Sequence, residues 1–153
     1  QLLNYETIAI DPDKKMLELN TFENKVLGSA ENLPFEDNSF DNVFCSFVWR
    51  NVSDTNKALE EVHRVLKPGG KFILLDMTRP KNSFLKILHK IGTFKVLHLI
   101  GLLTFNLKEY RFLYKSLDFY PQPENHLKKD TFIDLQIERM GLFNFVYLAV
   151  FTK

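Results

Sequence analysis

Cysteine and glycine are both scarce in this sequence of 153 residues. The single cysteine, Cys45, has no partner for an internal disulfide, so a disulfide scaffold is excluded and a reducing, intracellular setting is expected. The six glycines contain no pair with G-x-G spacing. These residues therefore hold neither of the common glycine-rich loops that bind nucleotide phosphates.

An excess of charge of one sign is also lacking, because 20 Lys and Arg residues face 19 Asp and Glu residues and leave a formal net charge of +1. This balance argues against a general nucleic-acid binder. The apolar run over 96–103 is far shorter than the roughly 20 residues that a membrane-spanning helix needs. Apolar residues still make up 45% of the chain, which is enough for one globular domain with its own core.

The charged residues are unevenly distributed along the chain. Residues 1–80 carry nine basic and thirteen acidic side chains, a net charge of −4, whereas residues 81–153 carry eleven basic and six acidic ones, a net charge of +5. No acidic residue occurs between Asp76 and Glu109, where six basic residues are interleaved with Phe, Leu and Ile. Such a basic, apolar stretch fits a membrane surface or a lipid-like ligand. The plainer interpretation is an amphipathic helical pair packed on the core.

Residues 1–78 alternate β-rich and helical segments. We expect strands at 7–10, 25–28, 42–48 and 71–76, a helix at 14–19, and a second helix whose apolar stripe covers 58–66. Ser53 is the expected N-cap of the second helix. The run 42–48 is apolar nearly throughout, as in a strand buried on both faces of a parallel sheet. The short connections between alternating strands and helices predict an α/β fold with a right-handed βαβ sheet.

The second half of the chain is mostly helical by pattern. We expect helices at 84–99, 106–117 and 129–140, the last capped by Gly141. A closing strand is expected at 143–151, because this segment is rich in aromatic and β-branched residues.

Polar residues follow the first two predicted strands, at the sheet edge where ligands of open α/β sheets bind. Asp11 ends the first strand, and its carboxylate is able to accept both ribose hydroxyls of an adenosine. An aspartate in such a turn also serves as a plain helix cap. Ser29 and Ala30 follow the second strand, where backbone groups could contact an adenine edge.

A denser set of polar groups follows the third predicted strand. Ser46 lies near the end of the strand, and Arg50, Asn51, Ser53 and Asp54 come within the next eight positions. A cation, an amide, a hydroxyl and a carboxylate together at a strand end are typical of a reaction centre, although a plain helix entry has a similar composition.

Three longer stretches carry a family resemblance. They read LPFEDNSFD over 33–41, RNVSD over 50–54 and RVLKPGG over 64–70. In these stretches the chain resembles class I S-adenosylmethionine-dependent methyltransferases. The RNVSD stretch is the narrower signature, and it is similar to the C-methyltransferases of ubiquinone and menaquinone biosynthesis.

The resemblance implies a Rossmann-like sheet with helices on both faces and a helical cap. It divides the chain into an α/β core over 1–78, a cap insertion over 79–120, and a C-terminal helix and closing strand over 121–153. In the family, a first strand and a glycine loop for the methionine part of the cofactor come earlier, so we expect both to precede Gln1.

The resemblance also assigns roles to single residues. For the cofactor S-adenosylmethionine, it places Asp11 on the ribose hydroxyls, Ser29 and Ala30 at the adenine, and Ser46 at the boundary with the substrate. Near a quinol substrate it places Arg50 and Asn51 as catalytic candidates, with Asp54 as a third. No metal is required, and the histidines and Cys45 show no metal-ligand spacing.

The function that the resemblance implies is C-methylation of a demethylmenaquinol or ubiquinol precursor by a cytoplasmic enzyme. A small quinol-like molecule is then the substrate, nucleic acid is not a partner, and the basic apolar stretch allows peripheral contact with a membrane. Two alternatives remain open. One is methylation of another small molecule or lipid, and the other is a non-catalytic methyltransferase-like module.

Overall fold

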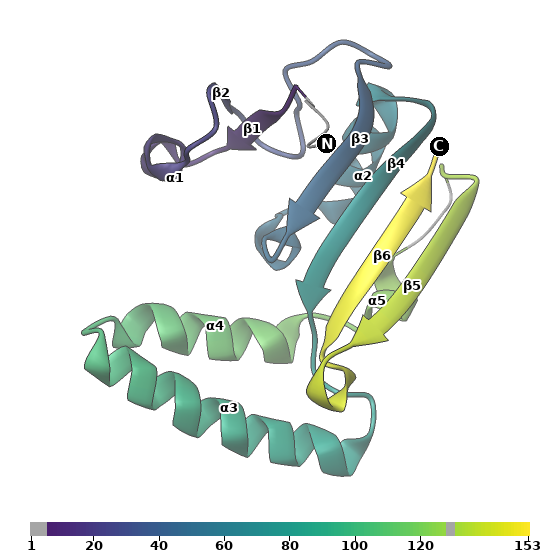
Figure 1. Cartoon of the computed structure of the whole chain (residues 1–153). Helices are drawn as coiled ribbons and strands as arrows, with labels where there is room; N and C mark the ends of the chain where they lie inside the picture. Colours follow the sequence, from purple (N-terminus) through teal and green to yellow (C-terminus); the bar gives the residue numbers. More distant parts are fainter. Residues whose placement is uncertain (1–5, 128–130) are drawn as a thin grey trace, which may run out of the picture.

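The computed structural model describes residues 6–127 and 131–153 and shows a mixed α/β fold (Figure 1). Its strands are β1 (Ile8–Asp11), β2 (Asn24–Leu27), β3 (Phe40–Ser46), β4 (Leu66–Met77), β5 (Asp134–Met140) and β6 (Val146–Thr152). Its α-helices are α1 (Lys14–Leu19), α2 (Thr55–Val65), α3 (Ser83–Leu103), α4 (Leu107–Phe119) and α5 (Pro123–His126), and short 3-10 helices cover Trp49–Asn51 and Leu142–Asn144. The α/β class expected from the sequence is confirmed.

The strands form two separate sheets. β1 and β2 pair in parallel with each other, and the other four strands follow the order β3-β4-β6-β5. β3 and β4 are parallel, whereas β6 runs antiparallel to both β4 and β5. The expected βαβ unit is therefore present at β3-α2-β4, and an antiparallel pair closes the sheet.

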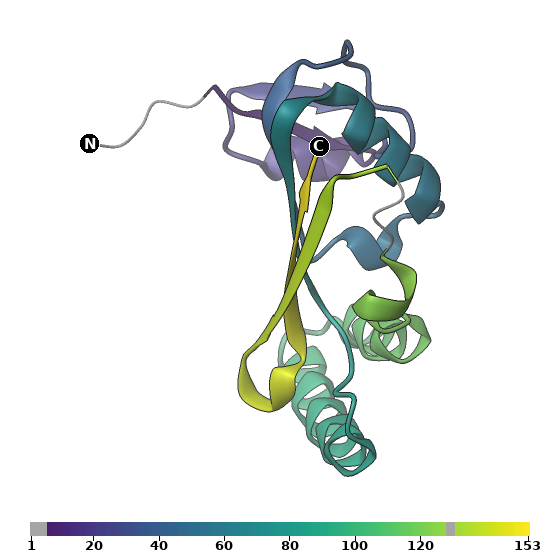
Figure 2. The same ribbon diagram turned by 90° about the vertical axis from the view of Figure 1, so that its right-hand side faces the viewer.

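The core lies on one face of the four-stranded sheet. Phe72 and Leu74 of β4 and Phe151 of β6 are fully buried there, and the rings of Phe72 and Phe151 stack at 5.5 Å. α2 covers these side chains with a stripe of buried apolar residues, and α5 lies on the same side of the sheet (Figure 2). Burial of each such side chain contributes about 1.5–3 kcal/mol.

The expectation that the third strand is buried on both faces was wrong. Residues of β3 alternate between half-buried and exposed, and Phe44 is 71% exposed. The alternation has a physical cause, because successive side chains of a strand point to opposite faces. Only the face toward α2 is packed at this strand.

The N-cap of α2 is Asp54 rather than the expected Ser53. The Asp54 carboxylate accepts hydrogen bonds from the backbone N–H groups of Asn56 and Lys57, each at 3.1 Å. The Ser53 N–H instead donates to Glu31 Oε1 at 2.9 Å. A carboxylate at this position satisfies two of the N–H groups that a helix start leaves free.

The helix expected at 129–140 was wrong over its described part. Asp134–Met140 forms β5, paired with β6 through contacts such as Ile137 opposite Ala149. Leu135 and Ile137 pack against the core, while Gln136 and Glu138 are exposed. This alternation has the period of a strand. Gly141, at φ +78°, lies in the turn between β5 and β6 instead of capping a helix, and residues 129–130 lie outside the described part of the chain.

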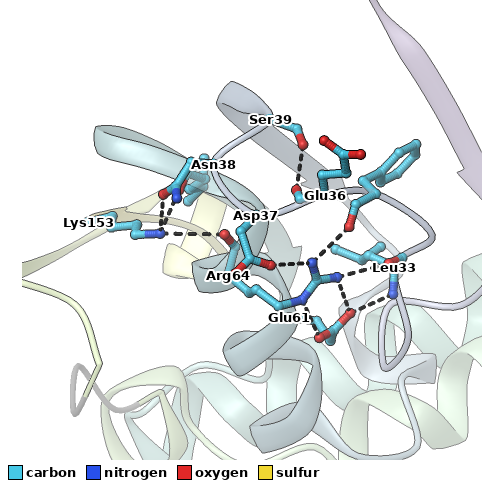
Figure 3. A network of polar contacts seen from close by, with 10 residues as sticks. Leu33, Glu36, Asp37, Asn38, Ser39, Glu61, Arg64 and Lys153 are labelled. Carbon is cyan, nitrogen blue, oxygen red and sulfur yellow. Dashed lines mark hydrogen bonds and ion pairs between the residues drawn. The ribbon is translucent and has the colours of Figure 1, made fainter.

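Arg64 holds the irregular segment that precedes β3 against α2 (Figure 3). Its guanidinium donates to the carbonyl oxygens of Leu33 and Phe35 at 2.9 and 2.7 Å. It also forms ion pairs with Glu61 at 2.8 Å and Asp37 at 2.9 Å. The planar fork of arginine makes several such bonds at once, so one side chain orders the whole LPFED segment.

A second arginine fastens the hairpin of α3 and α4 to the end of the sheet. Arg79 is only 1% exposed and donates to Asp118 Oδ1 at 2.9 Å and to Thr93 Oγ1 at 2.8 Å. Its guanidinium also lies 4.8 Å from the centre of the Tyr114 ring. The hairpin therefore lies beyond the carboxyl ends of β3 and β4 (Figure 1).

Replacement of glycine by alanine is expected to have opposite effects on stability at two positions. A Cβ at Gly70 would lie 2.8 Å from the Lys67 carbonyl oxygen and 2.9 Å from that of Asp41, whereas a Cβ at Gly92 in α3 meets nothing within 4 Å. We expect Gly70→Ala to lower the free energy of unfolding by about 2 kcal/mol and Gly92→Ala to raise it by about 0.5–1 kcal/mol. Urea denaturation measures both, and equal effects would contradict this packing.

Candidate functional site

The candidate site lies where β3 and β4 end. The two strands are parallel neighbours, with Ser46 opposite Leu75, so the residues that follow them meet at one edge. The chain after β3 enters the 3-10 helix that holds Arg50, and Asp76 follows Leu75 on β4. Two segments 26 residues apart in sequence are thereby brought into contact.

Arg50 and Asp76 form a buried ion pair at this edge. Arg50 Nη1 donates to Asp76 Oδ1, and the exposed fractions of the two side chains are 4% and 0%. The same carboxylate accepts from the backbone N–H of Arg50 at 3.2 Å and from that of Met77 at 2.7 Å. Burial raises the pKa of Asp76 above its usual value, and the Arg50 charge opposes that rise. A charge buried this deeply is tolerated because it is paired and hydrogen-bonded.

Three polar atoms near the ion pair are buried without a hydrogen-bond partner among the described residues. They are Trp49 Nε1, Arg50 Nε and the Tyr147 hydroxyl. Tyr147 lies opposite Asp76 in the β4–β6 pairing and is fully buried. Unpaired buried donors are uncommon in folded proteins, and they mark this place as one able to take up a polar ligand atom or a water molecule.

Arg50 also reaches the wall of a cavity of about 430 Å³. The other lining residues come from α4 and its end, and they are Phe112, Lys115, Ser116, Phe119 and Tyr120. A wall with three aromatic rings, two cations and two hydroxyl groups suits a flat organic molecule with polar substituents. The volume lies in the range of small-molecule sites.

The hydroxyl of Tyr120 is a further polar group at the cavity wall. Its hydroxyl lies 2.5 Å from His126 Nε2, and His126 Nδ1 lies 3.0 Å from the Gln122 carbonyl oxygen. Burial raises the pKa of Tyr120 and lowers that of His126. The prolines at 121 and 123 end α4 and begin α5, and this sharp turn places the histidine beside the tyrosine.

Three of the four predicted cofactor residues lie at the ends of the strands of the other sheet, whereas Ser46 ends β3. Asp11 ends β1, and its Oδ1 accepts from the Asp13 N–H at 2.8 Å. Ser29 and Ala30 follow β2, where Ser29 forms a bridge with Asn32. Asp11 is half-buried in the strand-to-helix turn, with its Oδ2 in no hydrogen bond among the described residues. This carboxylate is an acceptor of the kind that ribose hydroxyls need, with Oδ1 held in place by the Asp13 N–H.

Glu31 connects the predicted cofactor side with the predicted substrate side. Its carboxylate accepts from the backbone N–H groups of Ser53 at 2.9 Å and Asp54 at 3.4 Å. The segment that contains Ser29 and Ala30 is thus joined to the RNVSD stretch. Within the part of the chain that the structure describes, these bonds link two stretches that the sequence pattern identified separately.

The remaining predicted residues are less engaged with the cavity. Ser46 and Asn51 are exposed at the strand end and in the 3-10 helix, and neither lines the cavity. The Asp54 carboxylate is occupied by the two N–H groups that it caps. The cavity wall therefore contains one of the three catalytic candidates, Arg50.

Sequence reasoning missed Asp76, Tyr120, His126 and Tyr147. For Asp76 a signal was present, because an acidic residue ends the buried run FILLD in the same way that Asp11 ends β1. The tyrosines and the histidine carry no such signal. They meet the site only through the turn after α4 and the pairing of β6 with β4.

Solved structures with the same fold define the class of this protein. An S-adenosylmethionine-dependent methyltransferase from Thermotoga maritima superposes with a TM-score of 0.64 at 22% identity, over 95% of this chain and 72% of the other. A protein from Pyrococcus horikoshii superposes with a TM-score of 0.61 at 19% identity, over 97% and 73% of the two chains. The fold is that of the Rossmann-like class I methyltransferases.

The sequence identifies the family within that class. Residues 9–147 match the ubiE/COQ5 methyltransferase family, and the chain belongs to it. The ubiquinone/menaquinone biosynthesis C-methyltransferase UbiE of Rickettsia bellii is 46% identical over 114 residues, which is 72% of this chain and 46% of the relative. That of Rickettsia felis is 44% identical over 122 residues, 78% and 49% of the two chains. The chain spans about half the length of the curated relatives it matches.

Because Arg50 and Asp76 form a buried ion pair, we expect the effects of their substitutions on the free energy of unfolding to be strongly coupled. Arg50→Met leaves Asp76 buried and unpaired, so we expect the free energy of unfolding to fall by about 3–5 kcal/mol. The double variant Arg50→Met with Asp76→Leu removes both charges and is expected to recover most of that loss. Urea denaturation of the two single variants and the double variant measures the coupling. Additive losses would show that the pair is not a unit.

Proposed function

We propose that the intact gene product is an S-adenosylmethionine-dependent methyltransferase that methylates a ring carbon of a demethylmenaquinol or ubiquinol precursor. The observation that carries the proposal is the buried Arg50–Asp76 pair at the wall of an aromatic cavity. Family membership supports the reaction class, and the naming of the Rickettsia relatives as ubiquinone/menaquinone biosynthesis C-methyltransferases supports the quinol acceptor.

The cavity residues suit the acceptor's chemistry. A quinol ring is flat and apolar, and Phe112 and Phe119 offer rings of the same kind at the wall. A ring carbon becomes nucleophilic when a hydroxyl proton is lost or shared, which leaves negative charge on that oxygen. The Arg50 guanidinium, held in place by Asp76, stabilises this charge as it develops. Orienting the acceptor for in-line attack supplies a further part of the rate acceleration.

The methyl donor would occupy the ends of β1 and β2 and supply an electrophilic methyl group on a sulfonium sulfur. In this proposal Asp11 holds the ribose hydroxyls, and Ser29 and Ala30 border the adenine. Ser46 lies between donor and acceptor at the end of β3. Asn51, in the 3-10 helix, is the proposed contact for the part of the quinol outside the cavity, and Asp54 acts by capping α2.

Removal of the Asp11 carboxylate tests the donor side. We expect Asp11→Ala to raise the KM for S-adenosylmethionine about tenfold or more, because charge-assisted hydrogen bonds are lost, with a smaller change in kcat. The assay measures transfer of a labelled methyl group to a demethylmenaquinol analogue with a short side chain. Asp41→Ala is the matched control, since Asp41 is exposed and contacts Lys67 on the surface.

Two outcomes of that assay would count against the proposal. If the intact gene product transfers methyl groups only to acceptors without a quinol ring, the acceptor class is wrong. If calorimetry detects no heat with millimolar S-adenosylmethionine, the non-catalytic alternative is favoured.

We further propose that the hairpin of α3 and α4 contacts an anionic membrane surface, where a quinol with an isoprenoid tail would reside. Apolar side chains on the face of α3 opposite its buried residues His89 and Gly101 are 46–74% exposed, namely Phe84, Leu88, Ile91, Leu99 and Leu102. Their spacings of three, four and eight residues place them on one side of the helix.

Charge favours a lipid surface over a second copy of this hairpin. α3 carries Lys86, Lys90 and Lys95 and no acidic residue, although Lys90 already pairs with Asp118 of α4 at 3.0 Å. Two such helices would repel each other, whereas anionic lipid headgroups attract lysines by about 1 kcal/mol each. No helix in the described ranges 6–127 and 131–153 combines the length and hydropathy needed to cross a membrane. We propose that α3 contacts the membrane surface along its side, where these apolar side chains are exposed.

The membrane contact is tested by sedimentation with vesicles. We expect the intact gene product to bind vesicles that contain phosphatidylglycerol more tightly than vesicles of phosphatidylcholine alone. The double variant Leu99→Glu with Leu102→Glu should reduce that binding about tenfold or more. The control Leu19→Glu with Leu142→Glu changes side chains that are 77% and 72% exposed outside the hairpin. Equal loss in both variants, or concentration-dependent dimerisation without vesicle binding, would refute the assignment.

A further inference from the structure

A hydrogen-bonded tyrosine and histidine form part of the structure around the aromatic cavity. Tyr120 lines the cavity together with Arg50. Its hydroxyl is 2.5 Å from His126 Nε2, and the two rings meet edge to face at 4.6 Å. His126 is not among the lining residues, so the tyrosine stands between the cavity and the imidazole.

A backbone carbonyl fixes the direction of this hydrogen bond. His126 Nδ1 lies 3.0 Å from the Gln122 carbonyl oxygen. A carbonyl oxygen only accepts hydrogen bonds, so Nδ1 carries the proton of the neutral ring. Nε2 then has a free lone pair and accepts from the Tyr120 hydroxyl. The Tyr120 oxygen keeps acceptor capacity for a hydroxyl group in the cavity.

The surroundings of the pair favour passage of a proton from the tyrosine to the histidine. Burial lowers the pKa of His126 below its ordinary 6.5, so the imidazole is neutral and able to accept a proton at pH 7. Burial and the nearby Asp76 carboxylate raise the pKa of Tyr120 above its ordinary 10. The tyrosine therefore gives up its proton only when it receives another in the same step.

A set of ion pairs holds the histidine in position. α5, which ends at His126, is tied to β5 by Arg139, whose Nε donates to Glu124 Oε1 at 2.7 Å. Arg139 Nη2 also donates to Gln122 Oε1 at 2.7 Å. Lys81 adds a third contact, to Glu124 at 3.0 Å. The carbonyl that orients the imidazole is thus anchored from two sides.

We propose that Tyr120 is a catalytic residue that takes the hydroxyl proton of the acceptor while it passes its own proton to His126. The proposal rests on the methyl-transfer function proposed above. The acceptor's oxygen keeps the electron pair of its broken O–H bond, and the ring carbon uses a ring electron pair to form a bond to the methyl carbon. The methyl–sulfur bond breaks, and its electrons stay on sulfur.

The remaining protons balance as follows. The methylated ring carbon loses its hydrogen and the ring oxygen regains one, which restores the aromatic quinol. The net proton that the reaction releases is the one now on His126 Nε2, and it leaves to solvent before the next turnover. Until the ring oxygen regains its proton, Arg50 stabilises the negative charge on that oxygen.

The pH dependence of kcat tests the relay. Wild-type kcat should fall as the pH drops through the pKa of His126, because the protonated imidazole accepts nothing. His126→Gln should lower kcat about 100-fold and remove that acidic limb. Tyr120→Phe should have a similar effect. The double variant, with both substitutions, should have a kcat no lower than that of either single variant, because the two groups act as a unit. The charged and titratable groups facing the pair are Asp76, Glu124, Arg50, Cys45 and Tyr147.

His63→Gln is the matched control. His63 is also partly buried with a lowered pKa, but its ring packs on Phe132 beside α2 and away from the cavity. In this variant kcat should still fall at low pH as it does in the wild type. A wild-type pH profile in His126→Gln would overturn the relay.

A second measurement does not require methyl transfer. 4-Nitrophenol absorbs differently as phenol and as phenolate, so its spectrum reports whether a phenol bound in the cavity has lost its proton. At one pH unit below the probe's own pKa, the phenolate fraction of bound probe should be higher in the wild type than in Tyr120→Phe or His126→Gln. Equal fractions, or no binding of the probe, would refute the relay. A clear difference without quinol methylation would instead place the fault in the proposed function.

Discussion

The buried contact between Arg50 and Asp76 is the interaction on which the candidate site depends. It joins the 3-10 helix after β3 to the end of β4 and leaves both charges almost without solvent. Such a pair persists only where neighbouring groups complete its hydrogen bonds, here the N–H groups of Arg50 and Met77. The same contact fixes Arg50 at the cavity wall, while the pairing of β4 with β6 places Tyr147 opposite Asp76.

Three other arginines fasten the elements around that pair. Arg64 orders the segment before β3, Arg79 holds the hairpin of α3 and α4, and Arg139 holds α5. Each makes several bonds to carboxylates and carbonyl oxygens at once, in the fixed planar geometry of the guanidinium. The parts of the fold that carry the cavity wall are therefore fixed by polar contacts, while the sheet and α2 are held by apolar packing.

The two sides of the site are built in different ways. The predicted donor side rests on β1 and β2, which pair only with each other among the described residues. The acceptor side rests on β3, β4 and the hairpin. Glu31 connects them through the N–H groups of Ser53 and Asp54. Relative movement of donor and acceptor is thereby restrained close to the RNVSD stretch, which in-line methyl transfer would require.

The sequence by itself determined the mixed α/β class, most strands and helices, and the family, because helical and strand periodicities and the motifs at 33–41, 50–54 and 64–70 are local properties. It also indicated Arg50 as a catalytic candidate, and the structure places Arg50 at the cavity wall. The tertiary structure alone decided that Asp134–Met140 is a strand. Its alternating apolar and polar residues specify a strand only once β6 provides the partner for the backbone hydrogen bonds. It alone joined Asp76 to Arg50 and His126 to Tyr120. These contacts depend on where strand ends and turns meet in space, and no short stretch of sequence encodes that distance.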